Sequence, residues 1–590
     1  MSEKRLKTDV LVVGGGFSGC FAAVTARENG AEVILAEKNY CGKSGCSHFA
    51  RDFMLFKEEW GDNFGEWMEQ FSKIGEYIAD QRWDELIIRE SYDRYRDLVS
   101  WGVPFYIKDG SSNVPDAYGF PPPEEEPFRY KLRSTKYRKT SVVTKYAVRH
   151  KMMICRKKVL SVGASILDRT MITDLLKKDG RVVGAAGFNT QTGDYYIIEA
   201  KAVVIASGLL SFRPAYYGVW SSNGEGITMG YRAGADLSGM EFGAGMYVCS
   251  ECDSVCIDGP VSDITGIRDV VTNGRGEEFL DVGPHLPINI LWPIEVHKGN
   301  GPIYHDAYGV DRNKFKKELD KYNETAEGPW IEMLDRAGID IFNDRFEQYM
   351  SFIGSMFAGG LRVNYSCETT VPGLYAAGDA SGTNFTGPTY ASLGSGMCGA
   401  CVTGHRAGLN AARFAHGSEQ LEAEPNDLAA LKERILNPLE RKSGFRPDRV
   451  LMRIQQTIFP YEVRMVMHEK RLTAALTMFE FFRDHFIPML NAADSHELRL
   501  AHEVRSMVTG AEIMLRSALF RTESRGWFFR EDYPRRDDKN WLKWVLVSQG
   551  ENGRMNLRTE DVPKEYQGDL TLPYQERYPV TYGYGKGGTI

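Results

Sequence analysis

A glycine-rich turn near the N-terminus is the feature that most constrains the fold. An apolar run, Asp9–Val13, leads into Gly14–Gly19 (GGGFSG), and the alanine-rich stretch Phe21–Asn29 follows. A second apolar run, Glu32–Ala36, ends at Glu37. This order predicts a strand, a helix and a second strand, with small residues that let the backbone approach a pyrophosphate at the helix N-terminus. Glu37 stands about 20 residues further on, where it can accept hydrogen bonds from a ribose, so we predict a dinucleotide-binding βαβ unit.

Composition narrows the class of protein. A chain of 590 residues is expected to form two or three domains. Its net charge of −7 gives no reason to expect nucleic acid, and no stretch approaches the ~18 consecutive apolar residues of a membrane span. The N-terminus runs from a charged leader directly into a strand, without a secretory signal, so we expect a cytoplasmic protein that is not integral to a membrane. Its ten scattered cysteines are then expected to be reduced thiols.

The remaining periodicities outline the other elements. Residues 51–105 are expected to be helical, and Ile166–Phe188 with Tyr195–Ser207 alternates like a β-meander. Residues 426–520 carry Leu, Met, Arg and Glu at helical spacing. The tail 550–590 is rich in Gly, Tyr and Pro and shows no core pattern.

Three later segments bear on the choice of dinucleotide. Lys201–Gly208 (KAVVIASG) and Val371–Asp379 (VPGLYAAGD) stand at the positions of two strands found in two-dinucleotide-fold flavoproteins. Ser392–Gly404 begins another helix with small residues, which presents backbone N–H groups toward a flavin ring or phosphate. The resemblance implies that Asp379 approaches the ribityl chain. We therefore expect FAD rather than NAD.

At these residues the chain resembles the flavoprotein subunits of the fumarate reductase, succinate dehydrogenase and aspartate oxidase superfamily. The further match is to the α subunit of adenylylsulfate reductase, which the segments 8–20, 299–304 and 519–534 and Trp541 resemble. The resemblance covers roughly residues 7–565.

The resemblance implies an α/β fold: an FAD domain of the two-dinucleotide-binding type with an inserted α+β capping domain and a C-terminal helical domain. The expected boundaries are 1–215 and 371–425 for the two parts of the FAD domain, 216–370 for the cap, 426–545 for the helical domain and 546–590 for a tail. The expected cofactor-binding residues are Gly14, Gly16, Ser18, Gly19, Glu37, Lys38, Ser44, Gly45, Ser207, Gly208, Gly378, Asp379, Ser392 and Leu393.

The substrate groups of the superfamily are missing. Fumarate reductases hold a dicarboxylate with histidines and arginines, and one arginine delivers the proton. The histidine positions align near Met246 and near Ser355 or Met356, and the clamp arginine aligns near Tyr390. The proton donor would fall in 284–291 (PHLPINIL). A fumarate-type reaction is therefore not expected unless the alignment shifts by a few residues. The weak catalytic candidates are His285, Arg275, Arg362 and Tyr390.

Two further features concern covalent and metal chemistry. Succinate dehydrogenases attach FAD through a histidine where this chain has 43–46 (KSGC), and His48 comes about three residues late, so non-covalent FAD is expected. The cluster Cys249, Cys252 and Cys256 has the spacing of three ligands to zinc or an iron–sulfur cluster, although buried thiols are the more common outcome. Cys398 and Cys401 fit packing within a helix.

We therefore interpret the chain as an FAD-dependent oxidoreductase subunit that lacks the usual dicarboxylate-binding residues. The resemblance to subunits that dock iron–sulfur proteins makes a ferredoxin-like partner the expected one, with further redox subunits as additions. The alternative is an electron-relay flavoprotein of a larger redox complex that has no small substrate of its own.

Overall fold

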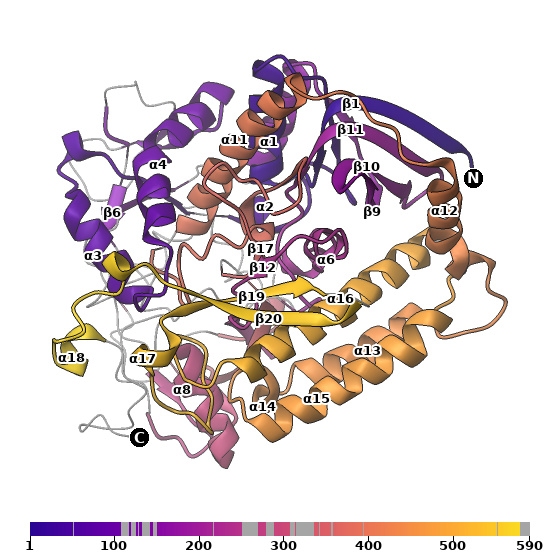
Figure 1. The fold of residues 1–590 in the computed structure, drawn as a ribbon. Coiled ribbons are helices and arrows are strands. Elements are labelled where there is room, and N and C mark those ends of the chain that lie inside the picture. The colour runs from indigo at the N-terminus through magenta and orange to yellow at the C-terminus, as the bar shows by residue number, and fades with distance from the viewer. Residues whose placement is uncertain are drawn as a thin grey trace.

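The computed structural model of the protein describes residues 1–50, 52–107, 117–119, 125–127, 129–131, 142–145, 150–215, 218–250, 270–278, 288–306, 313, 336–340, 343–355, 358–392, 394–550 and 553–578. Within these ranges no helix is both long and apolar enough to cross a bilayer. Figure 1 shows the fold.

The central sheet is built on the N-terminal strand. β1 (Glu3–Val13) lies between β2 (Val33–Ala36) and β11 (Tyr195–Ile205) and runs parallel to both. Its last residues, Val10–Val13, are almost fully buried, because helices cover both faces of a parallel sheet. The full order is β8-β2-β1-β11-β10-β9, and β18 (Leu374–Ala376) pairs with β11. The strand–helix–strand prediction for the first residues is confirmed.

The outer part of this sheet is an antiparallel meander. β9 (Thr170–Lys178) turns at Asp179 and Gly180, both at positive φ, into β10 (Arg181–Asn189), and β10 pairs antiparallel with β11. This agrees with the alternation of the sequence. On the other side, β8 (Ser165–Leu167) pairs parallel with β2.

Two long helices pack together on the sheet. Figure 1 shows α1 (Phe17–Glu28) beside α11 (Ser395–His416), although they are far apart in the sequence. Glycines of α11 make this approach close. A Cβ on Gly404 would lie 2.4 Å from the carbonyl oxygen of Ser18, and one on Gly408 would lie 2.3 Å from that of Ala22.

Smaller elements precede the meander. The stretch expected to be helical contains α3 (Phe64–Ile74) and α4 (Gln81–Trp101), but it opens with a strand, β3 (Asp52–Met54), that pairs with β7. The remaining elements of this part are α2 (Cys46–Phe49), β4 (Phe105–Ile107), β5 (Ala117–Gly119), β6 (Arg129–Lys131), β7 (Val142–Lys145) and α5 (Lys151–Ser161).

The middle of the chain adds a second, antiparallel sheet. Its order is β13-β16-β15-β14, and α8 (Ile288–Glu295) lies in the same part of the chain. The strand bounds are β13 (Ala244–Cys249), β14 (Val270–Thr272), β15 (Ile303–Asp306) and β16 (Phe346–Gly354). The helix α6 (Glu225–Arg232) connects this part to the central sheet.

The C-terminal part is a helical layer followed by two strands. Figure 1 shows the layer in orange, and it consists of α12 (Pro425–Glu440), α13 (Pro447–Ile458), α14 (Tyr461–Arg464), α15 (Glu469–Phe481) and α16 (Ser495–Phe520). After the short α17 (Asp538–Trp541), β19 (Lys543–Gln549) and β20 (Met555–Asp561) pair with each other. β19 also pairs with β12 (Leu237–Ser238), which in turn pairs with β17 (Gly360–Leu361).

The expectation that residues 550–590 carry no core pattern is wrong for part of that tail. β20 belongs to a sheet, and Tyr578, just after α18 (Tyr574–Arg577), is 1% exposed. Its ring meets that of Tyr77 edge to face, and its hydroxyl lies 3.1 Å from a guanidinium nitrogen of Arg525. A single aromatic anchor of this kind leaves no periodic signal in a sequence.

Buried charges fasten the segment between α16 and β19. The arginines 521 and 525 are fully buried, and both bond to the carboxylate of Glu523 at 2.8 Å. Arg525 also donates to the backbone carbonyl of Glu76 at 3.1 Å. Arg530 pairs with Asp532 at 2.7 Å. The segment is thus pinned to the body of the protein from within.

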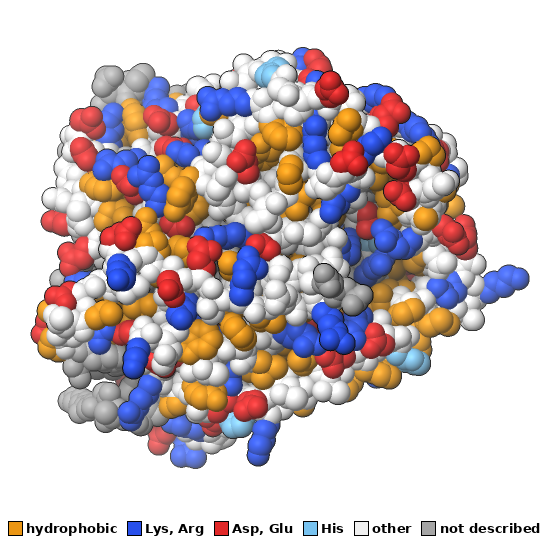
Figure 2. Space-filling model, in the orientation of Figure 1, with side chains coloured by type: hydrophobic (Ala, Val, Ile, Leu, Met, Phe, Trp, Pro, Cys, Tyr) orange, Lys and Arg blue, Asp and Glu red, His pale blue; other side chains and the backbone are white. Residues whose placement is uncertain are grey.

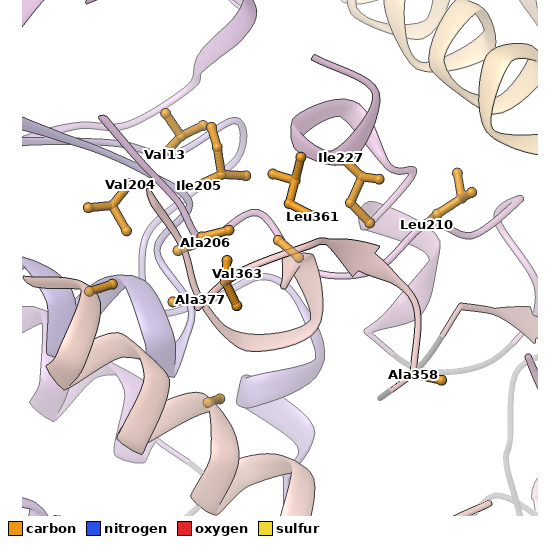
Figure 3. Close-up of a cluster of buried hydrophobic side chains, with 14 of the residues drawn as sticks. Val13, Val204, Ile205, Ala206, Leu210, Ile227, Ala358, Leu361, Val363 and Ala377 are labelled. Atoms are coloured by element: carbon orange, nitrogen blue, oxygen red, sulfur yellow. The ribbon is translucent and has the colours of Figure 1, made fainter. Parts of the chain in front are cut away.

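The strands converge on one apolar cluster. Figure 3 shows Val13, Ile205 and Ala377, at or just after the ends of β1, β11 and β18, with Ile227 of α6 nearby. The carboxyl ends of parallel strands are the edge at which α/β proteins bind ligands.

Candidate dinucleotide-binding site

A cavity opens at the carboxyl ends of β1, β2 and β11. Ten of the fourteen cofactor-binding residues expected from the sequence line it: Gly14, Gly16, Ser18, Glu37, Lys38, Ser44, Gly45, Ser207, Gly208 and Asp379. The cavity has a volume of about 100 Å³.

Glycine is required at the turn because two backbones meet there. Gly14 has φ +111°, and a Cβ on it would lie 2.3 Å from the carbonyl oxygen of Ala206. A Cβ on Gly19 would lie 1.9 Å from the carbonyl oxygen of Gly14. Gly16 is different, because the nearest atom to its Cβ would be the Ser47 hydroxyl at 3.1 Å. Gly16 is also the N-cap of α1 and provides no capping side chain. The Ser47 hydroxyl accepts the Phe17 N–H at 3.1 Å instead, so Ser47 would have to rotate away for an anion to use that amide.

Glu37 is held against the turn by hydrogen bonds. One carboxylate oxygen accepts the Gly15 N–H at 2.7 Å, and the other accepts the Asn39 N–H at 2.9 Å and the Ser44 hydroxyl at 3.0 Å. The side chain is buried at the end of β2. A carboxylate fixed in this way can still accept the hydroxyls of a ribose.

The neighbouring Lys38 belongs to a buried ion network. Its ammonium pairs with Glu225 and lies 2.9 Å from Glu503 of α16, which also bonds to Arg499 at 2.7 Å. Burial acts to lower the pKa of Lys38, but the two carboxylates outweigh it, so the pKa is raised and the lysine is charged. The network ties the helical layer to the wall of the cavity.

Asp379 lines the cavity directly after β18. Loss of hydration raises the pKa of its carboxyl to about 7. The thiol of Cys46 also lines the cavity, and burial, with a smaller contribution from the Asp379 charge, raises its pKa. The Cys46 thiol is therefore neutral at neutral pH, whereas the Asp379 carboxyl exchanges its proton close to pH 7.

The other expected cofactor residues lie close by in supporting roles. Gly19 and Gly378 do not line the cavity, but each permits a close contact, since a Cβ on Gly378 would lie 2.7 Å from the Ser18 hydroxyl oxygen. The carbonyl of Ser392 accepts the Ser395 hydroxyl at 2.7 Å near the start of α11. Leu393 lies outside the described residues.

The sequence interpretation missed several lining residues. They are Gly15, Cys46 and Ser47, Thr170–Ile172 of β9, Ser221 and Ser222, Glu225 and Gly226 of α6, and Met397 and Ala400 of α11. Gly15 lies within the predicted glycine turn, and Met397 and Ala400 lie within the segment 392–404 that was predicted to approach the flavin. Glu225 has a local signal, an acid between two glycines at a helix start. The others come to the cavity through tertiary contacts.

Among the catalytic candidates that the structure describes, none lines this cavity. His285 lies outside the described residues, and Arg275 is exposed. Arg362 pairs with Glu560 at 3.0 Å and lies over the Trp544 ring, with 4.7 Å to the ring centroid. Arg275 is therefore a surface residue, and Arg362 has a structural role in the contact with β20 and β19.

A buried apolar cluster connects the cavity-lining Cys46 with two residues singled out from the sequence. Met246 and Tyr390 pack, with Cys46, against one buried cluster that consists of Leu209, Val219, Ala244, Ile290, Ile294, Ile353, Val466, Trp527 and Phe529. Ser355 is fully buried, and its hydroxyl accepts the Leu210 N–H at 3.2 Å. Met356 lies outside the described residues, and Trp292 is buried in the main core.

The thiols give no described metal site. Cys398 and Cys401 are fully buried on α11, as the packing interpretation expects, and the described cysteines form no disulfide. Cys252 and Cys256 lie outside the described residues, as does the side chain of Cys249. Among the residues that the structure describes, no group of three His, Cys, Asp or Glu side chains could hold a metal ion.

Comparisons with known proteins agree with this architecture. A family described as "FAD binding domain" matches residues 9–396, and one described as "Fumarate reductase flavoprotein C-term" matches residues 455–578. One subunit of a fumarate reductase (CoM/CoB) from Methanothermobacter marburgensis is 26% identical over 571 residues, which cover 93% of this chain and 98% of the relative.

Two solved structures share the fold. Quinol fumarate reductase from Escherichia coli has a TM-score of 0.79 at 22% identity and covers 98% of this chain and 99% of its own. Adenylylsulfate reductase from Archaeoglobus fulgidus has a TM-score of 0.76 at 22% identity and covers 95% and 96%. The family resemblance and the fold class expected from the sequence are confirmed.

Proposed function

Because the chain belongs to the family of FAD-binding domains, we propose that it is an oxidoreductase flavoprotein subunit that binds FAD without a covalent bond and exchanges electrons with an iron–sulfur partner. The carrying observation is the cavity at the ends of β1, β2 and β11, with Met246 and Tyr390 near it where dicarboxylate-binding relatives would need charge. Bound FAD supplies the ability to accept a hydride and release single electrons.

The donor set fits that cofactor. The N-terminus of α1 would hold the pyrophosphate, and Glu37, which already accepts the Gly15 N–H, would also accept a ribose hydroxyl. Asp379 would meet the ribityl hydroxyls.

Non-covalent binding is supported because no histidine occurs among the described residues that line the cavity. The attachment segment contributes Ser44, Gly45, Cys46 and Ser47 to the cavity, whereas His48 does not line it. Acid precipitation is therefore expected to release yellow flavin into the supernatant. Flavin that stays with the pellet would contradict this, and loss of that retention in Cys46→Ser would identify the attachment atom.

The apolar side of the cavity argues against a dicarboxylate substrate. Two carboxylates need fixed cationic partners in a desolvated pocket, and each missing charged hydrogen bond costs about 1.5–3 kcal/mol. Met246, Tyr390 and Cys46 supply none. An activated carbon–carbon double bond in a largely apolar molecule is the substrate class that suits them. Fumarate should be reduced far more slowly than about 10 s⁻¹ when a reduced dye supplies the electrons.

An iron–sulfur partner accounts for the remaining features. The relative from Methanothermobacter is named as a subunit, and the described residues hold no metal-ligand cluster of their own. The inner face of 519–545 is pinned by buried arginines, while Phe520 and Tyr533 remain 38% and 39% exposed. We place part of the partner contact on this outer face, because exposed aromatics are enriched at interfaces.

Purification under anaerobic conditions tests the partner. The protein isolated with its natural neighbours should carry iron in a tightly associated second chain. Truncation after residue 578, which keeps the buried Tyr578, should preserve FAD, and Phe520→Ser with Tyr533→Ser should reduce the iron that co-purifies. A protein that purifies alone, free of iron, and reacts at full rate with an organic substrate or a nicotinamide would refute the proposal.

The same apolar surroundings also favour the second candidate, an electron relay without a small substrate. In that case the reduced flavin would react only with redox proteins. A screen of apolar enones and enoates as oxidants separates the two functions, because any rapid turnover would exclude a pure relay.

A further inference from the structure

A second cavity, here called the basic cavity, lies between α6, α12 and α16. Its volume is about 1120 Å³, and it is separate from the dinucleotide cavity. Figure 2 shows a hollow with clustered blue side chains between the positions that α6 and α12 occupy in Figure 1. Seven arginines line it against two glutamates, on a chain whose net charge is −7.

Two of the seven arginines are already paired, because Arg483 contacts Glu512 at 2.6 Å and Arg516 contacts Glu480 at 2.5 Å. Among the described residues, Asp174 is the one carboxylate that pairs with any of the other five. Asp174 of β9 serves two of the arginines, with Arg434 at 2.8 Å and Arg232 at 3.5 Å. Arg505 of α16 lines the same cavity, and within the described part of the chain no carboxylate lies within ion-pair distance of it. Like charges gathered in one hollow repel each other unless an anion joins them.

The pKa values record this environment. Burial lowers the pKa of Arg505, and the charges of Arg232 and Arg434 lower it further, while Asp174 opposes them. Burial likewise lowers the pKa of Arg232, against Asp174 and with Arg434. Both groups stay protonated at neutral pH, so their positive charge remains to be compensated.

One residue of the cavity wall carries a buried hydroxyl behind the lining. Tyr231 lines it and is 3% exposed, and its hydroxyl has no hydrogen-bond partner among the residues described. A buried hydroxyl without a partner costs free energy, which a bound acceptor would recover. Leu490, Ile487 and Met555 supply an apolar wall on which a non-polar part of a ligand could pack.

We propose that the basic cavity is a binding site for a small molecule carrying a polyphosphate group, with Arg232, Arg434 and Arg505 as its anion clamp. Planar guanidinium groups bind phosphate oxygens in pairs, and several of them around one hollow suit a chain of phosphates better than a single carboxylate. The volume of about 1120 Å³ slightly exceeds the range of about 300–1,000 Å³ for small-molecule sites, which leaves room for an organic group on the apolar wall.

Two helices join this site to the dinucleotide cavity. Glu225 at the start of α6 lines the dinucleotide cavity, and Arg232 at its end lines the basic cavity, about 10 Å away at 1.5 Å per residue. On α16, Glu503 contacts Lys38 while Arg505 faces the basic cavity. A ligand bound in the basic cavity would therefore change the affinity of the dinucleotide cavity for its cofactor without competing for that cavity.

Calorimetric titration of the FAD-loaded protein with inorganic triphosphate tests the proposal. Measurements at constant ionic strength separate a site from general screening. Arg505→Gln should weaken binding at least about tenfold, and Tyr231→Phe should weaken it several-fold. Arg449→Gln is the matched control, because that arginine is 70% exposed on α13 and should leave binding unchanged.

The outcomes discriminate between sources of the phosphate. Tighter binding of ATP than of triphosphate would support a nucleotide-class ligand, and equal binding would support recognition of the phosphate chain alone. No heat of binding at millimolar triphosphate would overturn the proposal, as would equal losses in Arg505→Gln and Arg449→Gln. Binding of polyglutamate with no binding of triphosphate would also overturn it, in favour of an acidic protein partner.

Discussion

The close contact of α11 with α1 gives the sharpest structural prediction, in the variant Gly404→Ala. The new methyl group would lie 2.4 Å from the Ser18 carbonyl oxygen and 2.8 Å from the Ser18 Cα. Ordinary contacts begin near 3.4 Å, so the two helices must separate by about 1 Å at this point. Ser18 belongs to the first turn of α1 and lines the dinucleotide cavity. The separation therefore moves part of the dinucleotide cradle, by which we mean the glycine turn Gly14–Gly19 and the first turn of α1.

The magnitude follows from two opposing terms. Overpacking of a buried contact costs about 1–3 kcal/mol, and a backbone neighbour that cannot rotate away puts this case in the upper half. Alanine is favoured over glycine in a helix interior by about 1 kcal/mol. The net loss of folding free energy should therefore be about 1–2 kcal/mol, with reduced FAD occupancy.

Denaturant unfolding and flavin content per protein chain measure both effects. Gly417→Ala at the C-terminus of α11 is the matched control, because the nearest atom to its Cβ would be 3.8 Å away. It should leave stability and flavin content within error of the wild type. If Gly404→Ala is as stable and as yellow as this control, the close-packing argument for the cradle is wrong.

Two buried charges give further predictions. Glu523→Gln should lower the unfolding free energy by about 1–3 kcal/mol, because it removes the carboxylate that Arg521 and Arg525 share, while Arg521 keeps Glu241 at 2.9 Å and Arg525 keeps Asp538 at 2.8 Å. Glu440→Gln on the surface of α12 is the control, and equal denaturation midpoints would refute the argument. Burial, and then the charge of Asp80, raises the pKa of the Asp84 carboxyl well above 3.8, so the folded protein keeps a proton that the unfolded chain loses and wild-type stability falls as pH rises above about 4. Asp84→Asn should therefore be more stable than the wild type, and this difference in unfolding free energy should grow above about pH 4 by up to about 1.4 kcal/mol per pH unit. A difference that stays constant between about pH 4 and 8 would contradict this.

The dinucleotide cradle was predictable because its signal is local. Gly14, Gly16 and Glu37 lie within one short strand–helix–strand unit, where the spacing of residues fixes their positions in space. The meander around Asp179 was predictable for the same reason, since alternation and a turn dipeptide act over a few residues.

The rest of the site depends on contacts between distant segments. Glu503 reaches Lys38 from α16, and Thr170–Ile172 reach the cavity from β9, without any pattern in the sequence that indicates it. Tyr578 is anchored by Arg525, whose burial cannot be inferred from a charged, tyrosine-rich tail. Arg362 was a catalytic candidate because of its position in the sequence. The structure shows that its guanidinium forms an ion pair with Glu560, a contact that the sequence does not indicate.

The reaction of the reduced flavin tests the central claim most directly. The FAD-loaded protein would be reduced without oxygen and mixed rapidly, in parallel experiments, with fumarate and with an oxidised ferredoxin, while flavin absorbance is followed. Apolar Met246 and Tyr390 beside the cavity predict slow reoxidation by fumarate, and the proposed partner predicts reoxidation by the ferredoxin at about 10 s⁻¹ or faster. Rapid reoxidation by fumarate with none by the ferredoxin would contradict the account.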